Sequence, residues 1–280
     1  MGKDMLPMVN FGGAKVSRLI CGCNPITGYS HFSEEKDWEF RKYYNFENTL
    51  KLVAECEKNG INTMQLRGDK FYLRLVLDHR ERGGKMNFIF VTANELKDIK
   101  ANIREMKQYG PIAVYFHGTY VDNTWHEGKI DEIRDYIKFM KDNGIYAGVG
   151  SHIPEVIEYA EENKWENDFY MCCLYNLAKK TKTVQGINAA GVEEKFQDAD
   201  RDKMTDMILK VKKPCLAFKL LAAGRNCKDK NSVEKAFKYA FDRIKPTDAV
   251  VVGMYQKDKN QVKENAEIVR KINKESKYSK

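Results

Sequence analysis

The chain has 280 residues, of which 42% are hydrophobic and 31% are charged, and its formal net charge is +8. This length and apolar content suffice for one large α/β barrel or for two ordinary domains. Lysines and acids alternate along the chain, as on a solvated surface, and no basic stretch carries the stacking aromatics of a nucleic-acid motif. We therefore expect no nucleic-acid partner. The alternative to a solvated surface is attraction of an anionic substrate, and the expected partner is a small-molecule substrate.

Two further features bear on location and cysteine chemistry. The N-terminal stretch MGKDMLPMVNF lacks the apolar core of a secretory signal, and no later run reaches the ~18 apolar residues of a membrane span. We expect a cytoplasmic protein without membrane contact.

The cysteines lack the paired CxxC spacing of a structural zinc site and lie mostly in apolar runs, which predicts buried, reduced thiols.

The first predicted elements are two short strands in MVNFGGAKVSRL, joined by a Gly-rich turn. From there on the chain repeats one pattern, a helical stretch that ends at glycine and is followed by a short apolar run. Gly60, Gly110 and Gly144 suit left-handed helix C-caps, and the β-branched or aromatic runs after them suit buried parallel strands.

The pattern predicts strands over 19–22, 61–66, 87–92, 112–116, 146–149, 169–174, 215–220 and 249–252. It predicts helices over 46–59, 70–82, 98–109, 129–143, 154–163, 199–212, 232–244 and 260–274. Such alternation is what a closed (β/α)8 TIM barrel requires. We expect a single domain over residues 1–280, with the N-terminal hairpin covering the barrel floor.

In such a barrel the functional residues lie where strands end and in the loops that follow. Four of the five histidines are expected on this top face, His117 and His152 at strand ends and His31 and His126 in loops. Other polar candidates at the strand ends are Gln65, Arg67, Asp69, Asn94, Glu95, Ser151, Asn176, Lys219 and Arg225. His152 has the alternative role of a helix cap, and Asp69 and Glu95 that of complementing a helix dipole.

Two long loops are also expected on this face. Residues 23–45 are rich in aromatic side chains and include Tyr29, and residues 177–198 include Lys179, Lys180 and Lys182. Long ordered loops are commonly binding loops or lids, and aromatic plus polar content suits a sugar or another polyol. Alternatively, the aromatic residues anchor the loop to the barrel.

Several stretches, taken in chain order, carry a family resemblance. They are NFGGAKVSRLICGCNPITG, KNGINTMQL, AVYFHG, GIYAGVGSHIPEVIEYA, CCLYNL, PCLAFKLLAAGR and VVVGMYQKDKNQVKENAEIV. Over nearly the whole chain, this order resembles the hairpin and strands of the aldo-keto reductases. The resemblance implies a (β/α)8 barrel, a nicotinamide cofactor (NADP or NAD) bound without a Rossmann motif, and a catalytic tetrad of Asp, Tyr, Lys and His.

Of that tetrad the resemblance retains only the histidine, His117, which would orient a substrate carbonyl. Gln65 stands at the aspartate position, residues 67–70 contain no tyrosine, and Asn94 stands at the lysine position. Glutamine and asparagine cannot deliver a proton at neutral pH, so the ordinary mechanism requires a different acid. The candidates are Tyr29, Asp69, Tyr72 and Lys219.

The resemblance also implies residues for the cofactor. Gln261, Glu264 and Asn265 match the types placed at the adenosine end, Asn176 is compatible with the carboxamide region, and Phe218 stands where an aromatic ring stacks on nicotinamide. These residues are equally compatible with ordinary helix-start and surface positions.

Three functions follow. The first is an oxidoreductase of the aldo-keto reductase type that acts on a carbohydrate or polyol carbonyl or alcohol with a non-standard proton donor. The second is a metal-assisted or acid/base isomerase, lyase or hydrolase, in which His31, His117, His152 and Glu95 could bind a divalent metal. The third is a non-catalytic ligand-binding barrel.

Overall fold

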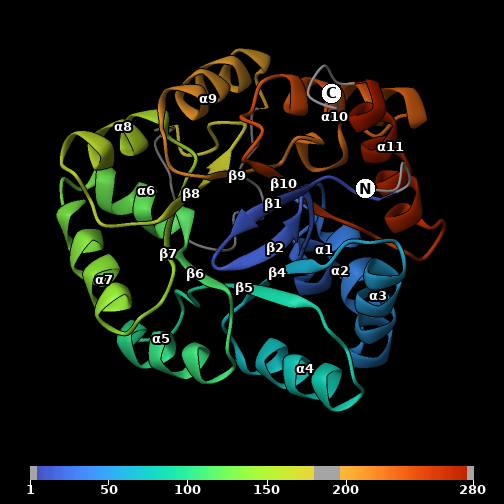
Figure 1. The fold of residues 1–280 in the computed structure, drawn as a ribbon, viewed down its shortest axis with the longest axis horizontal. Helices are drawn as coiled ribbons and strands as arrows, with labels where there is room; N and C mark the ends of the chain where they lie inside the picture. Colours follow the sequence, from blue (N-terminus) through green and yellow to red (C-terminus); the bar gives the residue numbers. More distant parts are fainter. Residues whose placement is uncertain (1–4, 180–195, 276–280) are drawn as a thin grey trace.

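Eight parallel strands close into a barrel in the computed structural model, which describes residues 5–179 and 196–275 (Figure 1). The strand order around the barrel is β10-β3-β4-β5-β6-β7-β8-β9. The strands are β3 (Leu19–Gly22), β4 (Thr63–Arg67), β5 (Asn87–Val91), β6 (Ala113–Phe116), β7 (Ala147–Ser151), β8 (Phe169–Cys173), β9 (Cys215–Phe218) and β10 (Ala249–Gly253). Each overlaps its predicted range, so the predicted (β/α)8 barrel is confirmed.

Helices surround the barrel of strands on the outside (Figure 1). Those predicted from the glycine-capped pattern are α3 (Phe46–Lys58), α4 (Lys70–Glu81), α5 (Ile99–Gln108), α7 (Asp131–Asp142), α8 (Pro154–Glu162), α9 (Asp198–Lys210), α10 (Lys230–Asp242) and α11 (Gln261–Glu275). Their apolar faces pack on the strands, and burying such faces supplies most of the stability of a helix in a protein.

Among the described residues, three helices lie where loops were predicted. They are α1 (Asn24–Thr27), α2 (Glu34–Tyr43) and α6 (Gly118–His126), and a short 3₁₀ turn, η1 (Ala222–Gly224), follows β9. Only Phe40 of α2 is buried, so this helix lacks the apolar periodicity that reveals a helix in a sequence. Ser33 caps it, and three acids follow in its first turn. His126 is therefore helical, which corrects its predicted place in a loop, and Lys180 and Lys182 lie outside the described residues.

An antiparallel hairpin of β1 (Met8–Phe11) and β2 (Ala14–Ser17) lies across the end of the barrel where the strands begin (Figure 1). Phe11 is 2% exposed, and its ring meets Phe169 and Tyr146 edge-on with centroids 4.8 and 5.2 Å away. The aromatic contacts and buried area explain why the hairpin closes the barrel floor as predicted.

Neighbouring strands bring the two strand-end histidines to the same face. Phe116 of β6 pairs with Val149 of β7, so His117 and His152 follow adjacent strand ends. Among the described residues, no helix is long and apolar enough to cross a membrane.

Candidate active site

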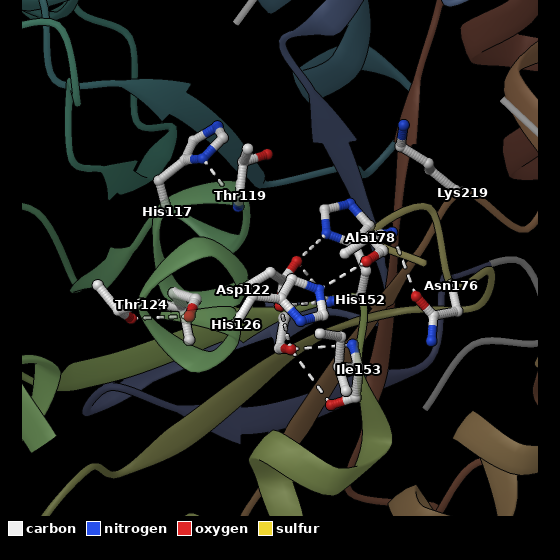
Figure 2. Close-up of polar contacts among 12 residues, drawn as sticks. His117, Thr119, Asp122, Thr124, His126, His152, Ile153, Asn176, Ala178 and Lys219 are labelled. Carbon is white, nitrogen blue, oxygen red and sulfur yellow. Dashed lines mark hydrogen bonds and ion pairs between the residues drawn. The ribbon is translucent and has the colours of Figure 1, made fainter. Parts of the chain in front are cut away.

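His117 follows β6 and caps the N-terminus of α6. Its Nδ1 accepts a hydrogen bond from the backbone N–H of Thr119 at 3.2 Å (Figure 2). A backbone N–H can only donate, so Nδ1 holds a lone pair and the ring proton is on Nε2. Burial, and then the positive charges of Arg67 and His152, lower the pKa of His117 to about 3. At neutral pH His117 is therefore an uncharged hydrogen-bond donor through Nε2.

His152 is the opposite case, a histidine held in its charged form. Its Nδ1 lies 2.6 Å from Oδ2 of Asp122 on α6, and its backbone N–H lies 3.3 Å from both carboxylate oxygens (Figure 2). Burial lowers the pKa of His152, but Cys173 and the Asp122 carboxylate outweigh that effect and raise it to about 10. His152 is thus an imidazolium at neutral pH, with its orientation fixed by Asp122.

The alternative that His152 caps the next helix is wrong. Ile153 occupies the N-cap of α8, and no side chain makes the capping hydrogen bond there. Ser151 instead donates through Oγ to Asp122 at 2.6 Å and accepts from the N–H of Ile153 at 2.9 Å. Ser151 and His152 are thus organised around Asp122, which the sequence did not single out because it lies in a segment predicted as loop.

Arg67, at the end of β4, forms a second charged cluster. Its Nε donates to Asp69 at 3.2 Å, and its Nη2 donates to Glu95 beyond β5. Asp69 also caps α4, because its carboxylate accepts hydrogen bonds from the backbone N–H groups of Phe71 and Tyr72. Asp69 therefore has the helix-terminal role expected as its alternative, and it forms an ion pair with Arg67 as well. Burial raises the pKa of Glu95, but Arg67 more than offsets this and holds it below its ordinary value. Arg67 was placed on the top face by the sequence but given no role.

Lys219 and His31 meet on the other side of the barrel mouth. Nζ of Lys219 lies 3.1 Å from Nε2 of His31, and Arg225 donates to the His31 carbonyl oxygen at 3.0 Å. His31 and Lys219 both have positive φ angles, 56° and 62°, which non-glycine residues rarely adopt. These contacts tie the segment that carries α1 and α2 to the connection after β9, and the positive charge of Lys219 also lowers the pKa of His117.

The residues at the other tetrad positions are not acids. Gln65 is 5% exposed and accepts a weak hydrogen bond from Sγ of Cys23 at 3.7 Å. Asn94 accepts from the Thr92 hydroxyl at 3.1 Å. Burial raises the pKa of Cys23 to about 12, so this thiol stays neutral, as expected for a packing cysteine.

A pocket of about 350 Å³ opens beside Arg67. Its lining includes Tyr29, Tyr44, Arg67, Asp69, Tyr72 and Glu95, from the segment after α1, the C-cap of α2, β4, the start of α4 and the loop after β5. Three of the candidate acids, Tyr29, Asp69 and Tyr72, line this pocket. Lys219, which lies with His31, is not among the lining residues, and neither are His117 and His152.

Aldo-keto reductases are among the solved structures to which the chain is similar. An aldo-keto reductase from Bacillus halodurans, in a holo form, matches with a TM-score of 0.60 and 14% identity over 95% of this chain and 90% of that one. An aldo/keto reductase from Brucella melitensis matches with a TM-score of 0.53 and 13% identity, covering 96% of this chain and 100% of that one. The chain has the aldo-keto reductase fold. No protein-family model and no curated protein sequence matches it.

The resemblance noted in the sequence predicts a nicotinamide cofactor, and the residues expected at the two ends of its site are placed differently in the structure. At the nicotinamide end, Phe218 is partly exposed and its ring lies 5.7 Å from that of His152, while Asn176 follows β8 with its Oδ1 bonded to the N–H of Ala178. An accessible aromatic face and an amide fit a nicotinamide ring and its carboxamide.

At the adenosine end two of the expected residues already have partners within the chain, and the third is buried. Gln261 accepts from the N–H of Tyr255 at 2.9 Å, Glu264 pairs with Lys259 at 3.0 Å, and Asn265 is 5% exposed. Tyr255 is also bonded to Glu39 of α2. An adenosine moiety would have to displace these contacts, of which the Lys259–Glu264 pair is exposed and individually weak.

The metal alternative receives no geometric support within residues 5–179 and 196–275. No three His, Cys, Asp or Glu side chains there come together as a group that could hold a metal ion. His31 contacts Lys219 and Asn24, and His152 is paired with Asp122, so these two rings are engaged elsewhere.

Proposed function

We propose that the protein is an oxidoreductase of the aldo-keto reductase type, in which neutral His117 binds and polarises a carbonyl oxygen. The hydrogen bond from the N–H of Thr119 to Nδ1 of His117 carries this proposal. It leaves the proton on Nε2, so the ring presents a donor to the oxygen on which negative charge develops. The low pKa of about 3 keeps this donor uncharged across the physiological range.

His152 is the proposed proton donor in place of the absent tyrosine. Its raised pKa of about 10 means that it carries a transferable proton at neutral pH. Because Asp122 holds Nδ1, the proton would leave from Nε2, and the ring also has the Cys173 thiol as a hydrogen-bond partner. A nicotinamide bound between Phe218 and Asn176 would supply the hydride to the carbonyl carbon. His152 then protonates the alkoxide oxygen and regains a proton from water, which balances the reaction.

The substrate class proposed here is a carbohydrate or polyol carbonyl, or the corresponding alcohol in the reverse direction. Tyr29 and Tyr44 provide aromatic walls beside the polar Arg67 cluster, a combination that suits a hydroxylated ligand.

Cofactor binding is the direct test. Purified protein would be titrated with NADPH and NADH while cofactor fluorescence is followed, and sugar carbonyls would then be added. We expect saturable binding below millimolar concentrations, retained in His117→Ala while turnover is lost. Absence of binding at millimolar concentrations of both cofactors would remove the proposal.

A second candidate is acid/base chemistry, such as isomerisation, without a nicotinamide. The internal partners of Gln261 and Glu264 favour it, because they occupy the groups expected to contact adenosine. Exchange of a substrate C–H hydrogen with deuterium from solvent, in protein free of nicotinamide, would support this candidate. If a broad sugar and polyol screen showed neither hydrogen exchange nor hydride transfer, the remaining function would be the third, a non-catalytic ligand-binding barrel.

A further inference from the structure

A buried cysteine lies at the end of β8, next to the strand that leads to His152. Cys173 is the last residue of β8, its side chain is 0% exposed, and its thiol is free. Alternate residues of a strand point to the same side, and Phe169 and Met171 belong to the cluster that fills the barrel interior. The side chain of Cys173 therefore points into the barrel as well, directly below the candidate active site.

The strand order shows that the ring of His152 lies over this cysteine. β8 lies between β7 and β9, Ser151 of β7 pairs with Cys172, and Cys173 pairs with Phe218 of β9. Neighbouring strands are about 4.8 Å apart, so β7 and β9 are separated by roughly twice that distance. The rings of His152 and Phe218 are nevertheless only 5.7 Å apart. Both rings therefore lean over the end of β8, where Cys173 lies between them.

The sulfur of Cys173 is a hydrogen-bond partner of the His152 ring. Nδ1 of this ring is held by Asp122 at 2.6 Å (Figure 2), which leaves Nε2 for the sulfur. Because both nitrogens of an imidazolium are donors, Nε2–H donates and the sulfur accepts. Burial lowers the pKa of His152, and Cys173 and Asp122 together raise it to about 10. Two partners on opposite ring nitrogens thus fix both the orientation and the charge of His152.

The chemistry of sulfur suits a partner that must give up its hydrogen bond. His152 is faced by Asp122 from α6, by Cys173 from β8 and by neutral His117 from the end of β6. Cys173 is fully buried, so it does not itself reach a ligand at the barrel mouth. Sulfur is a weak acceptor, whereas an oxygen that gains negative charge is a strong one. Such an oxygen can therefore take the Nε2–H of His152 away from the sulfur.

We propose that Cys173 is a positioning residue for His152, the proton donor of the proposed reaction. Its sulfur holds Nε2–H while Asp122 holds Nδ1, and it releases Nε2–H when an alkoxide oxygen forms beside the ring. The role in catalysis rests on the proposed oxidoreductase. The hydrogen bond itself needs neither cofactor nor substrate, so the two ideas can fail separately.

The first test is nitrogen-15 NMR of the His152 ring from neutral to alkaline pH, in protein free of cofactor. Cys173→Ala removes the acceptor and should lower the pKa of His152 by about 1 or more. Cys173→Ser supplies a hydroxyl acceptor and should recover part of that loss. Cys172→Ala is the matched control, because Cys172 is equally buried on the same strand but its thiol contacts Cys215 instead. It should leave the His152 titration unchanged.

A role in packing alone predicts a different result. Serine introduces a polar group into a buried site, so it would then be tolerated less well than alanine, and the His152 titration would be the same in every variant. An unchanged titration in Cys173→Ala, or equal shifts in Cys173→Ala and Cys173→Ser, would overturn the proposal.

The second test is the pH profile of carbonyl reduction with NADPH. In Cys173→Ala the alkaline limb of kcat should move to lower pH by the amount that NMR gives for His152, with KM changed less than kcat. An active Cys173→Ala variant with an unchanged alkaline limb would overturn the positioning role in catalysis. Absence of carbonyl reduction in the unchanged protein, with the NMR shifts as expected, would instead count against the oxidoreductase and leave the contact between Cys173 and His152 supported.

Discussion

Nδ1 of His152 lies 2.6 Å from Oδ2 of Asp122, a carboxylate that is only 1% exposed. The histidine follows a barrel strand, and the aspartate lies on the helix that follows the neighbouring strand. A buried carboxylate needs a partner, and the imidazolium together with the Ser151 hydroxyl provides it. The pair therefore links the charge of the proposed proton donor to the stability of the fold.

Replacing Asp122 by asparagine should return the pKa of His152 from about 10 toward its ordinary value. Because the folded-state pKa is raised, the stabilisation is complete below the unfolded value of about 6.5 and is lost as pH rises toward 10. Asp122→Asn should lower the free energy of unfolding by about 3 kcal/mol near neutral pH, and by less at alkaline pH. Urea unfolding across this pH range would measure the difference.

Ser151→Ala is the control for this comparison. Ser151 bonds the same carboxylate but does not titrate, so its loss should cost a similar amount of stability at every pH. If the cost of Asp122→Asn were equally independent of pH, His152 would not be charged in the folded protein.

The backbone N–H of Thr119 sets the tautomer of His117, because it donates a hydrogen bond to Nδ1. Thr119→Pro removes the N–H that bonds to Nδ1, at a first-turn position where proline is tolerated. The variant should contain a mixture of tautomers and lose about tenfold or more in kcat/KM for carbonyl reduction. Thr119→Ala keeps the backbone N–H and should behave as the unchanged protein does.

Nitrogen-15 NMR of the His117 ring would follow this change. In the unchanged protein we expect the Nε2–H tautomer and no titration near neutral pH, since the pKa is lowered to about 3. Because the unfolded chain binds this proton more tightly, His117 should also reduce stability as pH falls from about 6.5 toward 3. A titration midpoint near neutral pH would contradict the assignment.

Arg67→Gln should raise the pKa of Glu95 toward its ordinary value, because Arg67 supplies the contact that holds it down. The carboxylate contributes stability above its unfolded pKa and loses it as pH falls, so the variant should be less sensitive to mild acid. Carbon-13 NMR of the Glu95 carboxyl carbon would report the shift. Lys70→Gln breaks the separate pair with Glu105 and should leave the Glu95 titration unchanged.

The hairpin turn offers a test of how the barrel floor is closed. Gly12 and Gly13 both have positive φ angles, 57° and 80°, but only at Gly12 would a Cβ atom collide, 2.3 Å from the carbonyl oxygen of Ile112. Both alanine variants incur the left-handed backbone penalty, and Gly12→Ala should lose about 1–3 kcal/mol more. Chemical unfolding would compare the two, and equal losses would show that the hairpin can move away from the barrel.

Much of the architecture could be predicted because local chemistry encodes it. Gly60, Gly110 and Gly144 have positive φ angles, as predicted for helix caps, and the apolar runs that follow them lead into barrel strands. The barrel rule then placed His117 and His152 at neighbouring strand ends. The helix α2 was missed because its single buried residue leaves no apolar stripe for sequence periodicity to detect.

The sequence by itself determined the closed barrel, the hairpin floor and the face on which the candidate residues lie, since repeating apolar runs and glycine caps are short-range signals. Only the tertiary structure decided the chemistry of that face. Asp122 and His152 are separated by 30 positions, and His31 and Lys219 by 188, and nothing in the local sequence pairs them. Their charge states depend on burial and on partners from other strands, because electrostatic interactions act through space rather than along the chain.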